Sequence, residues 1–247
     1  MLPYKVFPSH IGIIQIHGLF EAIGFLIAIW LLARYVRKRW PEKVDNIYNI
    51  SLYVIIGSVI GARLAYVLGN WNLYNNDILQ AFNLLGGGLS YFGGLVGGIL
   101  AAYIYCRWKK IEFLYYADLF AVYIPLGHAI GRIGDYLIGE HIGTATNVPW
   151  AVMYQGELRH PVPLYDILAN LAIFFILIKF RKKNLRKGSL LAGYLIGYGL
   201  FRFLTSFIRV DEKALYSTSF IQVFALLVAV IAIIWVFIAR KKDESKG

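Results

Sequence analysis

The stretch GHAIGRIGDYLIGEHIG, residues 127–143, places three charged side chains at the end of an apolar run. Residues 119–126 before it carry no charge, and Arg132, Asp135 and Glu140 then follow among glycines. A charge inside a membrane helix costs about 2.5–3.5 kcal/mol on insertion scales, so it normally faces protein, water or a charged ligand. Glycines also let helices pack closely. The stretch therefore predicts a functional site or, more simply, a tight packing face with a charge pair at the membrane surface.

The composition of the chain is typical of an integral membrane protein. Its 247 residues are 59% hydrophobic, and the mean hydropathy is +0.60. Apolar runs of about 20 residues are long enough to cross a bilayer as helices. We therefore expect an all-α polytopic membrane protein with seven transmembrane helices and short interfacial segments. The predicted spans lie near residues 18–35, 47–68, 85–106, 114–136, 162–180, 189–208 and 218–239.

The net charge of +11 comes mainly from loops between alternate spans and from the tail. The positive-inside rule places such loops in the cytoplasm, so we expect the amino terminus outside and the carboxyl terminus inside. The basic excess then reflects topology and contact with anionic lipid, and we expect no nucleic-acid partner. The clusters are Arg34, Arg37, Lys38, Arg39 and Lys43; Arg107, Lys109 and Lys110; Lys179, Arg181, Lys182, Lys183, Arg186 and Lys187; and Arg240, Lys241, Lys242 and Lys246.

The remaining basic residues lie near the predicted outer ends of spans, against the charge rule. An anionic substrate in the outer leaflet would explain them, because guanidinium groups bind phosphate through two parallel hydrogen bonds. We expect Arg63, Arg132, Arg159 and Arg202 to converge on one cavity, although a snorkelling role is the alternative for Arg63. Tyr198, Arg202 and Arg209 recur on one helical stripe. The full set is Lys5, Arg63, Arg132, Arg159, Arg202, Arg209 and Lys213.

Two further features mark the predicted outer surface. His17 and Glu21 are four residues apart and share a helix face, either as functional groups or as an interfacial pair. The run LLGGGLSYFGGLVGG, residues 84–98, predicts a bent or broken helix whose backbone N–H groups bind phosphate. Close glycine packing is the alternative for this run.

Four motifs together resemble the bacterial phosphatidylglycerol–prolipoprotein diacylglyceryl transferases. GRIGDYLIGEHIG is similar to the family signature GR-x-GN-F-x-N-x-E-x-x-G, and GGGLSYFGGLVGG to its glycine-rich S-x-HGG segment. RHPVPLYD, residues 159–166, is similar to RHP-x-QLYE, and GYGLFRF, residues 197–203, to GYG-x-FR. The resemblance covers nearly the whole chain. It implies transfer of a diacylglyceryl group from phosphatidylglycerol to the lipobox cysteine thiol of a prolipoprotein, with glycerol phosphate leaving.

The resemblance also implies partners, a location and a site. The partners are phosphatidylglycerol or another anionic phospholipid and a lipobox-containing preprotein, and the location is the bacterial plasma (inner) membrane, crossed several times. We expect no cofactor and no metal. Arg132 and Arg202 are expected to hold phosphate, and Glu140 to orient an arginine or the headgroup. The candidate catalytic residues are His17, Arg132, Asp135, Glu140 and Arg202, and the candidate substrate-binding residues are Arg63, Tyr66, Tyr91, Gly93, Gly94, Gly131, Gly143, Arg159, Tyr198 and Arg209.

Five positions depart from the family motifs. The signature asparagine is Asp135, the histidine of the glycine-rich segment is Phe92, and the tyrosine at the outer end of the first span is His17. The acidic residue one turn past the GYG-x-FR arginine is Ser206, and the glutamine of HP-x-QLYE is Pro163. The departures leave open a divergent transferase, a paralogue with another donor or acceptor, or a non-catalytic phospholipid-binding protein. A transporter is less favoured, because no inverted repeat is evident.

The loss of the motif histidine raises the question of what accepts a thiol proton. We hypothesise that His17, oriented by Glu21, is the general base, with Asp135 as the next candidate. An interfacial pair without a catalytic part is the alternative. In domain organisation, we expect one seven-span membrane domain over residues 1–242 and a short disordered tail over residues 243–247.

Overall fold

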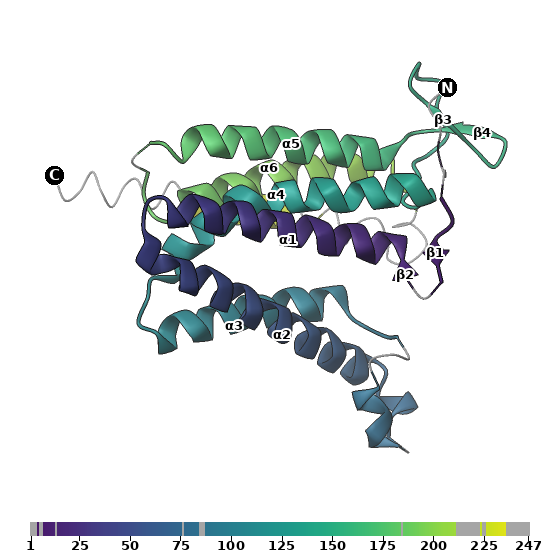
Figure 1. The fold of residues 1–247 in the computed structure, drawn as a ribbon. Coiled ribbons are helices and arrows are strands. Elements are labelled where there is room, and N and C mark those ends of the chain that lie inside the picture. The colour runs from purple at the N-terminus through teal and green to yellow at the C-terminus, as the bar shows by residue number, and fades with distance from the viewer. Residues whose placement is uncertain are drawn as a thin grey trace. The chain divides into compact units, whose positions relative to one another are not determined.

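The computed structural model of the chain is mainly helical, with two short antiparallel strand pairs (Figure 1). It describes residues 4, 7–12, 14–75, 77–83, 87–183, 185–210, 223 and 226–235. The main elements are β1 His10–Ile11, β2 Ile14–Gln15, α1 Ile16–Arg37, α2 Val44–Gly69, α3 Tyr91–Trp108, α4 Phe113–Ile138, β3 Val152–Tyr154, β4 Glu157–Arg159, α5 Val162–Phe180 and α6 Ser189–Ser206. Short 3-10 helices occupy Pro41–Lys43, Trp71–Leu73 and Ile78–Phe82.

Several of these helices are suited to a membrane. Within the described residues, four helical segments are long and apolar enough to cross a bilayer, and a shorter apolar helix follows at Leu226–Trp235. The chain is therefore an all-α membrane protein with several apolar helices. Half of the predicted seventh span lies outside the described residues, and its described half contains the Leu226–Trp235 helix. The predicted tail, Lys5 and Lys213 also lie outside the described residues. The four segments are Ile16–Arg37, Pro41–Gly69, Phe113–Ile138 and Val162–Phe180.

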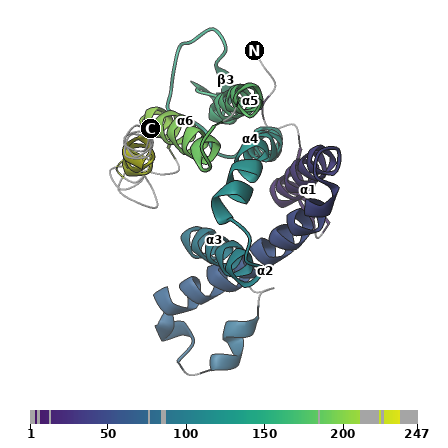
Figure 2. The ribbon, with the colours of Figure 1, turned by 90° about the vertical axis from the view of Figure 1, so that its left-hand side faces the viewer.

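The chain divides into two compact units. The first contains residues 1–31 and 117–247, and the second contains residues 32–116. In the first unit α4 lies between α1 and the α5–α6 pair (Figure 2). It contacts α5 through the rings of Tyr123 and Phe174, whose centroids are 6.1 Å apart, and α6 through His128 and Tyr194.

The glycines of α4 allow its close approach to α1. A Cβ atom at Gly127 would meet the carbonyl oxygen of Gly24 at 3.2 Å, and one at Gly134 would meet the Cβ of Phe20 at 2.8 Å. Any larger residue would force these two helices apart. The tight packing face predicted for residues 127–143 is therefore present, and it leaves the charged side chains of α4 beside the start of α1.

The segment after α4 fastens three helix ends together. The Thr144 N–H group donates to the Ile208 carbonyl oxygen at 2.8 Å. The His160 N–H group donates to the Thr144 carbonyl oxygen at 3.1 Å, and the Gly143 N–H group donates to the His160 carbonyl oxygen at 3.1 Å. This backbone pairing joins the end of α4 to the start of α5 and the end of α6.

In the second unit α2 and α3 form an antiparallel pair held by glycines. A Cβ atom at Gly97 would collide with backbone atoms of Gly57 and Gly61. A Cβ atom at Gly93 would collide with the backbone of Gly61. The α3 helix is continuous from Tyr91, and its first turn is capped by the Ser90 hydroxyl, which accepts from Gly93 N–H at 3.3 Å. The prediction of a bent or broken helix is therefore wrong over residues 91–108, and the close-packing alternative is correct.

Candidate functional site

Two arginines and two aspartates form a charge network where α4, α5 and α6 meet. Arg132 Nη1 donates to Asp135 Oδ2 at 2.5 Å, and its Nε lies 3.4 Å from Asp166 Oδ2. Arg209 Nη2 donates to the same Asp166 oxygen at 2.5 Å. Asp135, Asp166 and Arg209 are all buried. Buried charges are tolerated when they are paired and hydrogen bonded, and this network meets both conditions.

His17, at the start of α1, is hydrogen bonded to this network. Its Nδ1 atom pairs with Asp135 Oδ1, and its Nε2 atom lies 3.4 Å from Glu21 Oε1. The His17 side chain is 33% exposed, whereas that of Asp135 is only 1% exposed. The expected His17–Glu21 pair is therefore present, but Glu21 faces Nε2. The expectation that Glu21 orients the imidazole is corrected, because the group on Nδ1 is Asp135.

Glu140 and His141 add titratable groups beside His17. Ligand atoms of His17, Asp135 and Glu140 all lie within 4.8 Å of one another, and His141 Nε2 is 3.8 Å from Asp135 Oδ2. A cation would fit such a group by distance alone. Both oxygens of Asp135 are already engaged, however, one by His17 and the other by the Arg132 cation. We therefore interpret the group as a hydrogen-bonded network. In the part of the chain that the structure describes, the Glu140 carboxylate pairs with no arginine.

An aromatic cluster connects this network to α6. The Tyr194 and Tyr198 rings are stacked with centroids 5.8 Å apart, and the His128 ring lies 5.6 Å from that of Tyr198. Tyr198 therefore contacts α4 through His128, which lies one helical turn before Arg132. Arg202 follows Tyr198 by one helical turn and is partly buried. The α6 stripe predicted from sequence therefore approaches the α4 site through Tyr198. Its expected third member, Arg209, lies beyond the last residue of α6, and it joins the network from the following segment, where it forms a bridge with Gly143.

Arg159 holds the loop instead of joining the arginine network. Its Nη2 atom is 2.7 Å from Glu157 Oε2, and its Nη1 atom donates to the Gly143 carbonyl at 3.3 Å. The adjacent His160 contacts the Tyr165 hydroxyl at 3.0 Å, and burial lowers the pKa of His160. The predicted convergence of Arg159 with Arg132 is therefore not seen, because β4 directs Arg159 toward its own strand pair.

Arg63, in the second unit, also has a local role. Its Nε donates to Ala81 O at 2.7 Å, its Nη1 to Gly87 O at 2.6 Å, and its Nη2 to Gln80 O at 2.7 Å. These bonds engage the guanidinium with backbone carbonyls, so Arg63 clamps the loop between α2 and α3. The structure therefore gives Arg63 a loop-clamping role, and its predicted part in substrate binding stays a prediction.

The other glycine and tyrosine candidates include residues that pack within the second unit and one glycine that lies beside Glu21. Tyr66 packs against Gly88, and Gly93 packs against Gly61. Gly131 lies against Glu21, because a Cβ atom there would meet Glu21 Cγ at 3.3 Å. Two neighbouring candidates in the second unit remain sequence predictions. They are Tyr91 and Gly94.

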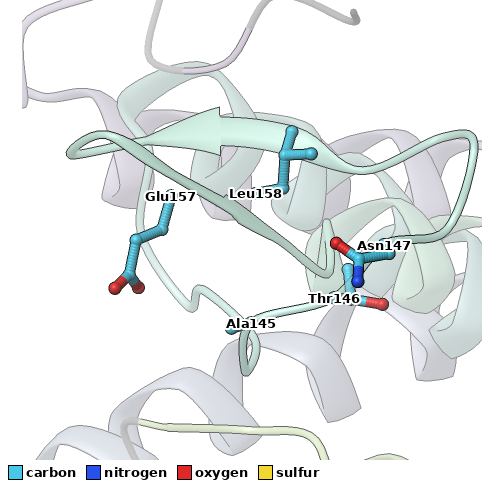
Figure 3. A pocket seen from close by; sticks show the side chains of 5 residues that line it. All are labelled: Ala145, Thr146, Asn147, Glu157 and Leu158. Atoms are coloured by element: carbon cyan, nitrogen blue, oxygen red, sulfur yellow. The ribbon is translucent and has the colours of Figure 1, made fainter.

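A hollow of about 400 Å³ lies beside the β3–β4 strand pair (Figure 3). None of its lining residues belongs to the charge network, and it contains no catalytic pair. We therefore place the candidate site at His17, Asp135 and Arg132, where charges and a titratable ring meet. The hollow is lined by Ala145, Thr146, Asn147, Glu157 and Leu158.

Sequence reasoning did not select Asp166 or His141 as site residues. Asp166 is the last residue of the RHPVPLYD motif, and its signal is an acidic side chain at the start of an apolar span. His141 directly follows Glu140 in the decisive stretch and has a positive φ of 55°, which turns the chain after α4. Asp166 contacts both Arg132 and Arg209, and His141 lies beside the Asp135 carboxylate that contacts Arg132 and His17.

Fold and site together define a helical membrane protein with a buried arginine–carboxylate network and a partly exposed histidine. The family model for prolipoprotein diacylglyceryl transferase matches residues 7–238. The chain belongs to this family of transferases.

Named relatives have similar lengths. The chain is similar to the phosphatidylglycerol–prolipoprotein diacylglyceryl transferase of Clostridioides difficile, with 38% identity over 93% of this chain and 92% of the relative. The enzymes of the same name from Finegoldia magna and Aeromonas hydrophila are 30% and 33% identical. These alignments cover 85% and 94% of this chain and 88% of each relative.

Proposed function

We propose that this protein transfers a diacylglyceryl group from phosphatidylglycerol to the lipobox cysteine thiol of a prolipoprotein. In this reaction the sulfur forms a bond to the terminal glyceryl carbon of the diacylglyceryl group, and the bond from that carbon to the phosphate oxygen breaks. The electron pair leaves with glycerol phosphate. The observation that carries the proposal is the Arg132–Asp135–His17 arrangement, because it places a phosphate-binding cation next to a titratable ring.

Arg132 is the proposed phosphate-binding group. Within the described residues its Nη2 atom has no hydrogen-bond partner, while Nη1 and Nε face Asp135 and Asp166. A guanidinium held on two sides presents its remaining donor in a fixed direction, which suits an anion whose charge grows as the bond breaks. Arg202 is proposed to assist from α6, and Glu140 to contact the phosphatidylglycerol headgroup.

The membrane arrangement is part of the proposal. We propose seven spans in one membrane domain, with the amino terminus outside, the carboxyl terminus in the cytoplasm and the location in the bacterial plasma membrane. The clustered basic residues support the orientation, and the several apolar helices support the multi-pass arrangement. The charge network then lies at the outer ends of α1 and α4, where lipid and a secreted preprotein are both accessible.

Purified protein incubated with glycerol-labelled phosphatidylglycerol and a lipobox peptide tests the proposed function. We expect the peptide to gain a diacylglyceryl thioether and labelled glycerol phosphate to appear. A serine-for-cysteine peptide is the matched control and should remain unmodified. Lack of both products with a well-folded preparation would contradict the transferase assignment.

A second candidate is a non-catalytic phospholipid-binding protein of the same fold. It is favoured by Ser206, which stands at an acidic family position, is fully buried and donates to the Phe203 carbonyl at 2.6 Å. Phe92 in place of the motif histidine favours it as well. Such a protein would bind phosphatidylglycerol vesicles through Arg132 but would leave the peptide unmodified in the same assay.

A further inference from the structure

We infer that Asp135 is the positioning residue that holds His17 as the proton acceptor for the attacking thiol, while the same carboxylate holds Arg132. The inference rests on the proposed function and deepens it. The supporting observation is that the two oxygens of the buried Asp135 carboxylate contact two different side chains. Oδ1 pairs with His17 Nδ1, and Oδ2 accepts from Arg132 Nη1 at 2.5 Å.

The Asp135 contact determines which ring nitrogen of His17 can accept a proton. An ionised carboxylate only accepts hydrogen bonds, so His17 Nδ1 must carry the hydrogen in this pair. The neutral imidazole then has its lone pair on Nε2, the atom on the side away from Asp135. The His17 side chain is 33% exposed, and the carboxylate beside Nε2 is that of Glu21, whose side chain is 61% exposed. A thiol that displaces this carboxylate reaches Nε2, and the Asp135 carboxylate on the other nitrogen stabilises the imidazolium that forms.

The groups that surround His17 favour acceptance of a proton. On its own helix, Glu21 Oε1 lies 3.4 Å from Nε2, and this carboxylate is largely exposed and free to move aside. From the segment after α4, Glu140 has a carboxylate oxygen within 4.8 Å of a His17 nitrogen, and the His141 ring centroid is 6.4 Å away. Arg132 is the opposing cation, but Asp135 lies between it and the ring. Three carboxylates therefore face His17.

The shared carboxylate also brings the two halves of the reaction together. The thiol proton moves to His17 Nε2, and the sulfur attacks the glyceryl carbon. The phosphate oxygen leaves with the bonding electrons beside Arg132, and His17 later returns its proton to water. Because Asp135 fixes both side chains, the thiolate is generated next to the bound phosphate. This proximity lowers the cost of bringing the two reacting groups together.

A peptide whose acceptor group is already ionised, and so needs no proton acceptor, distinguishes a catalytic role of His17 and Asp135 from a purely structural role. Transfer by wild type, His17→Gln, Asp135→Asn and Arg132→Lys is measured with a cysteine lipobox peptide and with its selenocysteine counterpart. A selenol is more acidic than a thiol and is already ionised at neutral pH. With the thiol at pH 7, we expect His17→Gln and Asp135→Asn to lower kcat/KM by about 10²–10⁴-fold. With the selenol, His17→Gln should return to within about tenfold of wild type, because the proton acceptor is no longer needed. Asp135→Asn should recover only the part of its loss that comes through His17, because Asp135 also holds Arg132.

Raising the pH gives a second readout on the same variants. The defects of His17→Gln and Asp135→Asn with the thiol peptide should shrink above pH 8.5, roughly the pKa of a free thiol. Arg132→Lys should remain impaired with both acceptors at every pH, because its defect concerns phosphate binding. Glu42→Gln is the matched control and should stay near wild type, since Glu42 is an exposed carboxylate on the Pro41–Lys43 3-10 helix and contacts neither His17 nor Arg132.

The outcomes that overturn the inference differ from those that overturn the function. If wild type is active and His17→Gln is equally impaired with thiol and selenol, His17 is not the base. If the selenol rescues Asp135→Asn no more than it rescues Arg132→Lys, Asp135 does not act through His17. His17→Gln alters a partly exposed side chain, so it decides the first point even if Asp135→Asn fails to fold. A folded wild type that modifies neither peptide overturns the proposed function, and this inference with it.

Discussion

Arg209 on the segment after α6 and Asp166 on α5 form a buried ion pair, with Nη2 and Oδ2 2.5 Å apart. The two side chains are 3% and 5% exposed. Removing one partner of a buried pair leaves a charge without compensation, which costs about 3–5 kcal/mol. We therefore expect Asp166→Ala to lower the free energy of unfolding by about that amount in detergent solution.

The exposed pair of Arg159 and Glu157 provides the control for this measurement. Their atoms are 2.7 Å apart, but the Glu157 side chain is 58% exposed. Solvent screens such a pair, so Glu157→Ala should change the free energy of unfolding by at most about 1 kcal/mol. Equal effects of the two substitutions would contradict the assignment of Asp166 to a buried network.

Glycine packing between α2 and α3 is tested by adding one methyl group. A Cβ atom at Gly97 would collide with the backbone of Gly57, whereas one at Gly69 would meet no atom within 4 Å. We expect Gly97→Ala to destabilise the protein by about 1–3 kcal/mol through overpacking. Gly69→Ala should be neutral or slightly stabilising, and thermal unfolding of both variants checks the difference. A broken α3 helix with exposed glycines would tolerate both changes alike.

The loop clamp predicts a local effect of Arg63→Lys. Lysine has a single nitrogen, so it cannot replace bonds from Nε, Nη1 and Nη2 to three carbonyls. Carbonyls left without these donors should make loop opening easier by roughly 1–2 kcal/mol, which corresponds to about 5–30-fold faster proteolysis within residues 71–89. The exposed Arg107→Lys is the control. Unchanged cleavage in Arg63→Lys would show that the clamp is not needed.

The proposed orientation is tested by cysteine labelling in intact cells. Cysteines placed by Arg37→Cys and Lys182→Cys should not react with an impermeant reagent added outside. A cysteine placed by Asn147→Cys, in the segment after α4, should react readily. The native Cys106 is buried and gives little background. Labelling of the first two positions, with protection of the third, would reverse the proposed topology.

The sequence predicts most helices well because lipid imposes one simple requirement. A span needs a long apolar run, and such runs mark the observed helices at Ile16–Arg37, Val44–Gly69, Phe113–Ile138, Val162–Phe180 and Ser189–Ser206. The structure of a glycine cluster is harder to predict, because glycines occur both where a helix breaks and where two helices pack closely. The run at residues 84–98 was predicted to break the helix, but Gly93 and Gly97 instead bring α3 against α2.

The candidate site was only partly predictable for a related reason. The three charges of residues 127–143 stand out because charged residues are rare in spans, whereas their partners depend on tertiary contacts. The spacing of His17 and Glu21 correctly indicates a shared helix face. It cannot reveal that Asp135, from a helix far along the chain, occupies the other ring nitrogen. Arg63 and Arg159 have the same side chain as Arg132, yet their neighbours assign them to loops.

The mass spectrum of a lipobox cysteine peptide after incubation with defined phosphatidylglycerol tests the central claim most directly. Wild-type protein should shift the peptide by the mass of one diacylglyceryl group, and glycerol phosphate should form in equal amount. Arg132→Lys should reduce both products, because a point charge lacks the planar fork that holds phosphate beside Asp135. An unmodified peptide with folded wild type, or an undiminished yield from Arg132→Lys, would contradict a transferase built on this network.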